Sequence, residues 1–326
     1  MLTGPGEAAV ELVEPPRAGQ GEVVVDVERV GVCGTDVEFF TGEMQYLHDG
    51  HARYPMRLGH EWSGTVSAVG DGVDPGWLGR RVTGDTMLGC GRCRRCRRGL
   101  QHVCADRQEI GIRGGRPGAL AEQLAVPASA LHALPDALDP ARGALVEPGG
   151  NALRAALAAG AGPGDRVLVL GPGTIGLLTA MFLRAAGAEV NLLGVTPASL
   201  EFARHLGFSA AASPPFDAVV DASNAAESPA RAVELVEPGG RVVYIGLAGR
   251  PSLIDTRMLA LKDVTAVGLL SASPGLAETI ARYAAGEVDP TPLVAATVGL
   301  EEVADVLAGR RPAAAGPGPK IHVDPR

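Results

Sequence analysis

A chain of 326 residues is longer than one hydrophobic core usually supports, so two domains are expected. Hydrophobic residues make up 46% of the sequence and charged residues 20%, which is ordinary for a globular protein. The formal net charge of −8 gives no reason to expect binding to nucleic acid or to an anionic membrane. The longest uncharged run, 167–183, is too short and too interrupted by glycine to span a membrane. No secretion signal opens the chain, which predicts a cytoplasmic protein.

The first part of the chain is predicted to be rich in β-strands. Apolar and polar side chains alternate over 22–30, which indicates a half-buried strand, and the pattern recurs over 61–70. Another short strand, 80–85, follows a turn of glycine and proline. Short strands broken by glycine are typical of a small β domain.

Four cysteines follow in the tight spacing C-x2-C-x2-C-x7-C, namely Cys90, Cys93, Cys96 and Cys104. Four thiolates this close together predict a closed structural zinc site in a lobe at about 88–106, rather than a disulfide framework. Five arginines are interleaved with these cysteines: Arg92, Arg94, Arg95, Arg97 and Arg98. They are compatible with a zinc module that binds nucleic acid, but more simply with a solvated face that balances the thiolate charge.

A second set of metal-binding side chains is spread over three separate stretches. Cys33 follows the first strand, His60 and Glu61 open the second, and Glu147 precedes a proline. Zinc accepts mixed sulfur, nitrogen and oxygen ligands in a tetrahedron, and a catalytic site leaves one position open for water or substrate. We therefore predict a catalytic zinc in addition to the structural one.

From residue 151 the sequence pattern changes and predicts alternating helices and apolar strands. A strand at 165–170 leads into Gly171-Pro172-Gly173-Thr174-Ile175-Gly176, which opens a helix, and a second strand follows at 189–194. A G-x-G-x-x-G motif in this setting predicts a dinucleotide whose pyrophosphate approaches the glycine amides. Further strands at 216–222, 241–246 and 264–269 favour an α/β fold with a doubly wound parallel sheet. Only 209–215 separates the second helix from the next strand, so one strand and its crossover helix are expected to be abbreviated.

These motifs, in this order, resemble the zinc-dependent medium-chain alcohol dehydrogenases, and most of all their polyol, sorbitol and threonine dehydrogenase branch. The resemblance spans nearly the whole chain. It implies a GroES-like catalytic domain at 1–150, a Rossmann domain at 151–270 and a return to the catalytic domain at 271–326. It also implies two zinc ions per chain, a small alcohol or ketone substrate, no nucleic-acid or membrane partner, and a homodimer or homotetramer.

The same resemblance suggests roles for individual residues. Cys33, His60 and Glu147 would hold the catalytic zinc, with Glu61 as an intermittent ligand. Thr35 would hold the substrate hydroxyl and Asp36 would accept a ring N–H of His60. Glu38 stands where many relatives place a proton-relaying histidine.

The reaction implied is hydride transfer from a secondary alcohol of a polyol, sugar or cyclitol to NAD(P), giving a ketone. Alternatives are an inactive relative that binds NAD(P)H or a partner protein, and the zinc-free quinone reductase branch, which the zinc-type ligand set argues against. The second strand of the cofactor domain carries no acidic residue at its end, which favours NADP over NAD although no arginine stands in that turn, the nearest being Arg204. The residues assigned to the cofactor are Gly171, Gly173, Thr174, Ile175, Gly194, Thr196 and Gly246.

Overall fold

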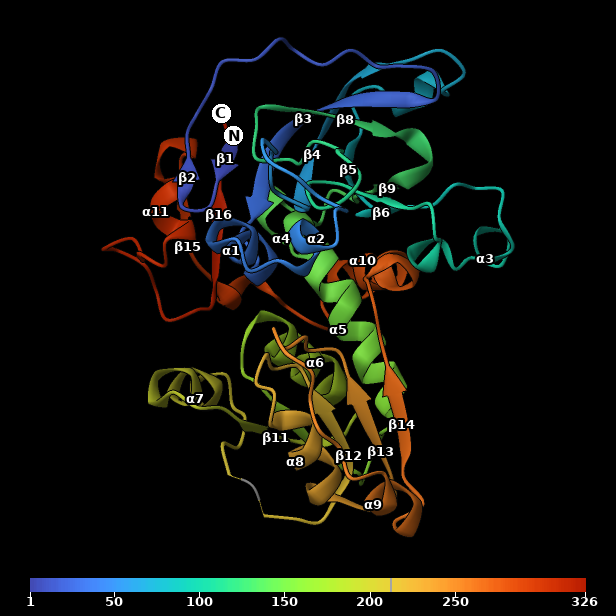
Figure 1. Ribbon diagram of the computed structural model, residues 1–326, viewed down its shortest axis with the longest axis vertical. Coiled ribbons are helices and arrows are strands. Elements are labelled where there is room, and N and C mark those ends of the chain that lie inside the picture. Colours follow the sequence, from blue (N-terminus) through green and yellow to red (C-terminus); the bar gives the residue numbers. More distant parts are fainter. Residues whose placement is uncertain (212) are drawn as a thin grey trace. The chain divides into compact units, whose positions relative to one another are not determined.

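A computed structural model describes residues 1–211 and 213–326, which form two compact units (Figure 1). Unit 1 comprises Met1–Glu147 together with Leu276–Arg326, and unit 2 comprises Pro148–Gly275. The chain therefore leaves the first unit, completes the second and returns. The boundaries expected from the sequence, after residues 150 and 270, lie close to these positions.

Unit 1 is built on a seven-stranded sheet of order β15-β16-β3-β4-β5-β9, with β8 also paired to β3. Its strands are β3 (Glu22–Gly31), β4 (Glu61–Val69), β5 (Arg81–Gly84), β8 (Gln123–Pro127), β9 (Leu131–Ala133), β15 (Val294–Val298) and β16 (Lys320–Val323). Two smaller pairs are β1 (Leu2–Gly4) with β2 (Glu7–Ala8) and β6 (Met87–Leu88) with β7 (Gln108–Glu109). The helices are α1 (Gly34–Thr41), α2 (Gln45–His48), α3 (Arg94–Arg97), α4 (Pro140–Ala144), α10 (Leu276–Ala284) and α11 (Val303–Leu307).

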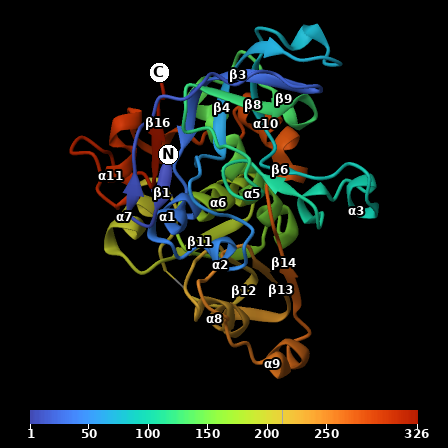
Figure 2. The same cartoon turned by 45° about the horizontal axis from the view of Figure 1, so that its top comes forward.

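The core of unit 1 follows from the alternation in β3 and β4. Val23, Val25 and Val27 are fully buried, because alternate side chains of a strand share one face of the sheet, and they join a cluster that contains Trp62. Strand β16 lies beside β3 although nearly the whole chain separates them in sequence. The returning segment thus completes the sheet next to the strand that leads to Cys33, as Figure 2 also shows.

Unit 2 contains a parallel five-stranded sheet of order β11-β10-β12-β13-β14. Its strands are β10 (Arg166–Leu170), β11 (Glu189–Leu193), β12 (Phe216–Asp221), β13 (Val236–Tyr244) and β14 (Thr265–Gly268). Its helices are α5 (Val146–Ala159), which begins in unit 1, α6 (Thr174–Ala185), α7 (Pro197–His205), α8 (Ser228–Leu235) and α9 (Thr256–Leu261). After Arg166, strand β10 is apolar and buried because it lies inside the sheet, where parallel strands are covered on both faces. The predicted α/β class is confirmed.

The expected abbreviation of the cofactor domain is also present. Between α7 and β12, Ser209 forms a single bridge to Asn191 of β11, and its carbonyl accepts a hydrogen bond from Leu192 N at 2.8 Å. In the part of the chain that the structure describes, this bridge takes the place of a sixth strand. Within the same described ranges, no helix combines the length and the apolar character needed to cross a membrane.

Candidate active site and metal centres

Cys33 lies where β3 ends and α1 begins, as the residue that caps the helix. Its backbone N–H donates to Asp36 Oδ2 at 2.9 Å, which is one half of a capping box and fixes the start of α1. Thr35 and Glu38 follow on the same helix and are half-buried. The sequence Cys33-Gly-Thr-Asp36 therefore forms a rigid turn, with the thiol at its beginning.

Asp36 connects this turn to the stretch that carries His60. The carboxylate is fully buried; its Oδ1 accepts from Gly59 N at 3.3 Å and lies 3.5 Å from His60 Nδ1. Burial alone would raise the pKa of Asp36, but His60 and the two backbone donors lower it overall. Burial would lower the pKa of His60, but Asp36 and Cys33 raise it well above its usual value. The surroundings of the imidazole thus favour a positive charge.

The ligand atoms of Cys33, His60 and Glu61 lie within 4.8 Å of one another. Zinc bonds of about 2.0–2.3 Å place neighbouring ligand atoms of a tetrahedron roughly 3.3–3.8 Å apart. The three side chains therefore fit a zinc ion after a small contraction. Glu147, in the first turn of α5, is buried but is not a member of this group among the described residues.

A residue that sequence analysis did not identify joins the group. Lys320 of β16 donates from Nζ to Glu61 Oε1 at 2.9 Å and to Oε2 at 2.6 Å, so the carboxylate is held on both oxygens. The only signal in the sequence is that Lys320 is one of two lysines in a chain that otherwise uses arginine. That signal is weak without the fold, since β16 is short and follows a stretch rich in proline and glycine.

Tyr46 of α2 and His51, which follows that helix, take part in a polar network in unit 1. Tyr46 donates its hydroxyl to Glu109 Oε1 at 3.2 Å and accepts from Arg107 Nη2 at 2.9 Å. His51 contacts the ring of Tyr46 edge-on and lies 3.4 Å from Arg113 Nη2. Both side chains therefore belong to a polar network that supports α2.

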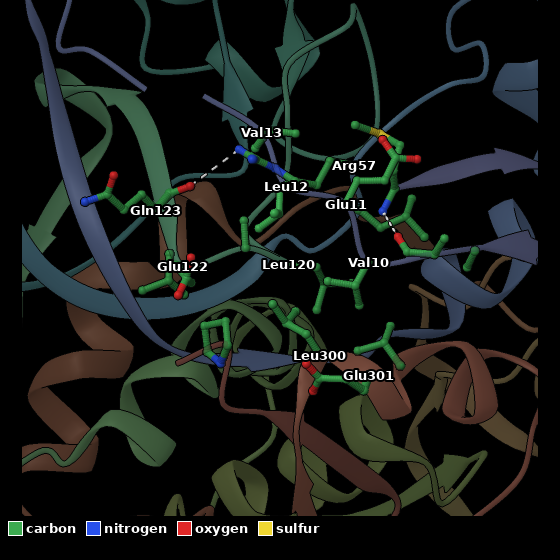
Figure 3. Close-up of a pocket in the computed structure, with 18 of the residues that line it drawn as sticks. Val10, Glu11, Leu12, Val13, Arg57, Leu120, Glu122, Gln123, Leu300 and Glu301 are labelled. Atoms are coloured by element: carbon green, nitrogen blue, oxygen red, sulfur yellow. Dashed lines mark hydrogen bonds between the residues drawn. The ribbon is translucent and has the colours of Figure 1, made fainter. Parts of the chain in front are cut away.

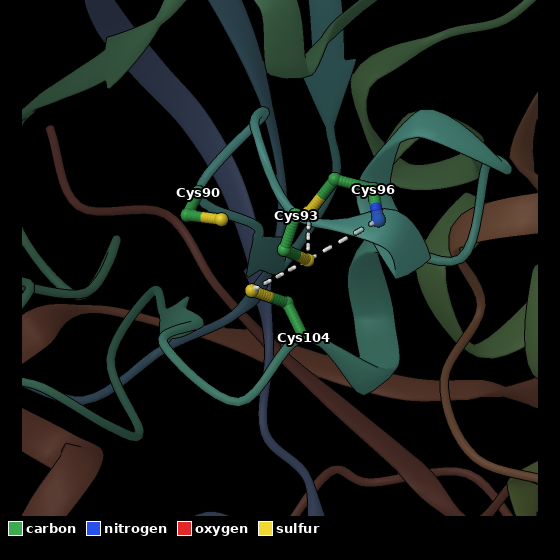
Figure 4. Close-up of side chains that lie close together, drawn as sticks. All are labelled: Cys90, Cys93, Cys96 and Cys104. Atoms are coloured by element: carbon green, nitrogen blue, oxygen red, sulfur yellow. Dashed lines mark hydrogen bonds between the residues drawn. The ribbon is translucent and has the colours of Figure 1, made fainter.

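The four-cysteine lobe is arranged for a tetrahedral ion (Figure 4). Cys93 Sγ lies 3.6 Å from Cys96 Sγ and 3.8 Å from Cys104 Sγ, and all four sulfurs lie within 4.8 Å. Zn–S bonds of about 2.3 Å require S···S edges of about 3.8 Å. The backbone N–H groups of Arg92 and Cys93 lower the pKa of Cys90 to about 6, which favours the thiolate that zinc needs. These thiols fit structural zinc.

The interleaved arginines of the lobe are all exposed. Arg97 Nε donates to the Arg92 carbonyl at 2.8 Å, which fastens one turn of the lobe to the next. Among the described residues, no carboxylate lies within ion-pair distance of Arg94 or Arg95. This is the solvated face that the simpler interpretation expects.

In unit 2 the glycine motif connects β10 to α6, with Gly173 at the helix cap. Gly194 follows β11, and a Cβ there would lie 2.6 Å from the Pro172 ring, so the two turns touch. Thr196 caps α7 by accepting from Ser199 N at 3.3 Å, and Arg204 is exposed in the last turn of that helix. Gly246, after β13, donates its N–H to the Asp221 carbonyl at 2.9 Å. The assigned residues thus gather at the carboxyl ends of the strands, with Arg204 at the far end of α7.

A cavity of about 790 Å³ lies elsewhere in unit 1 (Figure 3). It is bounded by the N-terminal segment around Val10–Val13, by Arg57 and Leu120, and by α11. It shares no residue with either set of cysteine-containing ligands. We therefore assign it no part in the chemistry.

A β-rich unit with two zinc-type ligand sets, joined to a parallel sheet with a dinucleotide motif, defines a zinc-dependent dehydrogenase. Comparison with known proteins agrees. The family model for an alcohol dehydrogenase GroES-like domain matches residues 19–136, and the model for a zinc-binding dehydrogenase matches residues 174–285. L-threonine 3-dehydrogenase of Legionella pneumophila (strain Corby) is 34% identical over 263 residues, which cover 80% of this chain and 73% of that protein.

Solved structures show the same likeness. A zinc-binding dehydrogenase of Sinorhizobium meliloti 1021, bound to NADP, superposes with a TM-score of 0.89 at 30% identity over 99% of this chain and 98% of that one. Galactitol-1-phosphate dehydrogenase of Escherichia coli gives 0.84 at 26% identity, with the same coverage. The chain belongs to the zinc-binding medium-chain alcohol dehydrogenases. The predicted family and its alcohol oxidoreductase activity with a nicotinamide cofactor are confirmed.

Proposed function

We propose that this dehydrogenase oxidises a secondary alcohol of a polyol, sugar or cyclitol to a ketone, with NADP preferred over NAD and zinc held by Cys33, His60 and Glu147. The observation that carries the proposal is the group of half-buried Cys33 with buried His60 and Glu61, with Asp36 behind the imidazole. The relatives named for L-threonine and galactitol 1-phosphate support a hydroxyl on a polar carbon chain.

When bound, zinc supplies Lewis acidity that makes a substrate hydroxyl easier to deprotonate. The protein residues do the rest. Asp36 keeps the His60 ring oriented, so the other ring nitrogen faces the ligand group. Thr35, two residues after Cys33, orients the substrate hydroxyl, and Glu38, one turn further along α1, passes its proton to solvent. Burial, and next the nearby Glu43, raise the pKa of Glu38, which brings it closer to a working pH for proton transfer.

The preference for NADP is supported by the turn after β11. Gly194 places no charge where a 2′-phosphate would lie, and the backbone at the start of α7 offers donors. The Thr196 hydroxyl already caps the helix, and Arg204 lies at its other end, so no side chain clamps the phosphate bidentately. The preference is therefore expected to be modest.

Two further parts of the proposal concern assembly and location. Strand β14 lies at the edge of the sheet and is largely exposed, as are Leu247, Leu253 and Leu261 in the same unit. An edge strand with exposed apolar side chains favours a homodimer, or a tetramer of such dimers. All five cysteines are free thiols, which supports a reducing, cytoplasmic environment.

The test is a panel of polyols, sugars, cyclitols and L-threonine, assayed by absorbance of the reduced cofactor with NADP and with NAD. Elemental analysis of the same preparation should return two zinc ions per chain. Turnover of a polyol, sugar or cyclitol is expected, faster with NADP. No turnover of any alcohol in a protein with two zinc ions would favour the inactive relative, and a single zinc per chain would contradict the two-site assignment.

A further inference from the structure

The Lys320 ammonium lies where β3 ends and β4 begins. Besides both Glu61 oxygens, its ammonium donates to the carbonyl of Val32 at 2.9 Å. Val32 directly precedes Cys33, and Glu61 directly follows His60. An ammonium has three donors and all three are used. One side chain from the returning segment therefore fastens both ligand-bearing stretches.

The contact spans three adjacent strands. In the sheet, β3 lies between β4 and β16, and Gly31 of β3 is opposite Glu61 on one side and His322 on the other. A Cβ at position 31 would overlap Glu61 Oε2. Because Gly31 has no side chain, the Glu61 carboxylate can extend across the middle strand and reach Lys320.

The pair is almost completely buried, with Lys320 3% and Glu61 1% exposed. A buried carboxylate without a partner is energetically costly, so Glu61 without Lys320 would bind another nearby cation. The ligand atoms of Cys33 and His60 lie within 4.8 Å of the Glu61 carboxylate, so a metal ion bound by these two residues would be the nearest such cation. Lys320 and the metal therefore compete for the same two oxygens.

We propose that Lys320 is a positioning residue that holds Glu61 off the catalytic metal, keeps one coordination position open for substrate and aligns the Cys33 and His60 stretches. The inference rests on the proposed zinc site and adds the residue that governs its open position. Without the ammonium, Glu61 takes that position, and the metal becomes more tightly held but less accessible.

The chain offers a matched control in its other lysine. Lys262 Nζ also makes three hydrogen bonds, to the carbonyls of Val233, Glu234 and Val236 at 3.0, 2.8 and 2.8 Å. It belongs to unit 2, whereas all the assigned zinc ligands belong to unit 1. Lys262→Met removes an equally well-bonded ammonium, so it separates loss of stability from an effect on the metal.

The experiment replaces zinc by Co²⁺ and records its visible d–d absorption, because the position of the band depends on which four atoms bind the ion. Subtracting the spectrum of the Cys33→Ser protein isolates the catalytic site from the four-cysteine lobe. In Lys320→Met the difference band should shift, because the Glu61 carboxylate replaces water in the fourth position, and transfer of zinc from this site to a chelator should slow by about tenfold or more. Lys320→Arg and the double variant Lys320→Met/Glu61→Gln should both keep the wild-type band, as should Lys262→Met.

The outcomes distinguish the two proposals. A wild-type protein without a difference band overturns the zinc site, and this inference with it. A wild-type band that Lys320→Met leaves unchanged, or that Lys262→Met shifts equally, overturns the role of Lys320 alone. If Lys320→Met does not fold, Lys320→Gln, which keeps a donor but no charge, is measured in its place, with the same result expected.

Discussion

The two metal-ligand sets of this protein are built in opposite ways. The four-cysteine lobe takes all its ligands from 15 consecutive residues, Cys90 to Cys104, and three of its four cysteines are only half-buried. The other set joins Cys33 to His60 and Glu61 through the buried Asp36, and its support extends to Lys320. A local set depends on its metal for shape, whereas a dispersed set inherits its shape from the sheet.

The largest expected effect tests this contrast directly. Cys96→Ser removes a ligand from a lobe that has little apolar core, so its metal site is lost and folding stability falls by several kcal/mol. Cys33→Ser leaves the sheet intact and should abolish turnover with little change in melting temperature. Thermal unfolding and activity of both variants, with zinc counted, provide the measurement; equal losses of soluble protein would show that the sites are misassigned.

Next in size is the proton path along α1. Glu38→Gln should lower kcat by about 10² or more, the usual scale for a positioned general acid or base. Its neighbour Glu43, which is exposed, serves as the control. Because Glu43 helps to raise the pKa of Glu38, Glu43→Gln should move the acid limb of the pH–rate profile to lower pH with little loss of maximal rate. A loss below threefold in Glu38→Gln would make Glu38 a bystander.

The third prediction concerns Asp36, which holds the stretches that carry Cys33 and His60 in a fixed arrangement. Asp36→Asn keeps the shape but loses the charge beside His60, so we expect zinc affinity at this site to fall by about 10–100-fold. Asp85 is a suitable control, since it is buried in the same unit with His132 Nε2 at 3.7 Å. Asp85→Asn should leave zinc affinity unchanged in a chelator competition, and an equal effect of both variants would contradict the special role of Asp36.

What could be predicted from the sequence follows the same division between local and dispersed. Strands β3 and β10, the glycine motif and the cysteine spacing are periodic or contiguous, and each was predicted close to its observed position. Lys320 could not be identified, because its pairing with Glu61 depends on the register of three strands. The expected ligand role of Glu147 stays a prediction, since its place relative to Cys33 depends on how α5 begins.

A smaller effect is expected from substitutions of Gly194, in the turn after β11. Gly194→Asp should shift the ratio of kcat/KM for NAD over NADP towards NAD, because a carboxylate there repels a 2′-phosphate. Any Cβ at this position presses on the Pro172 ring, however, and would disturb the turn by itself. Gly194→Ala carries the same Cβ without the charge, so only the difference between the two variants measures the electrostatic effect. A wild-type protein that prefers NAD by tenfold or more would end the NADP proposal.

The smallest effect is expected on the surface of the four-cysteine lobe. Arg94 and Arg95 are exposed on α3, and among the described residues neither lies within ion-pair distance of a carboxylate. Exposed side chains without partners usually change stability by no more than about 0.5 kcal/mol when replaced. The double variant Arg94→Ala/Arg95→Ala should therefore keep the unfolding free energy within about 0.5 kcal/mol of the wild-type value, with kcat/KM unchanged.

The wild-type protein should also show no binding to duplex DNA. Binding through phosphate contacts would be recognised by a log affinity that falls linearly with the log of the salt concentration. DNA binding that disappears in the double variant would restore the nucleic-acid interpretation of the lobe, and would mean that a locally built zinc site carries a function of its own.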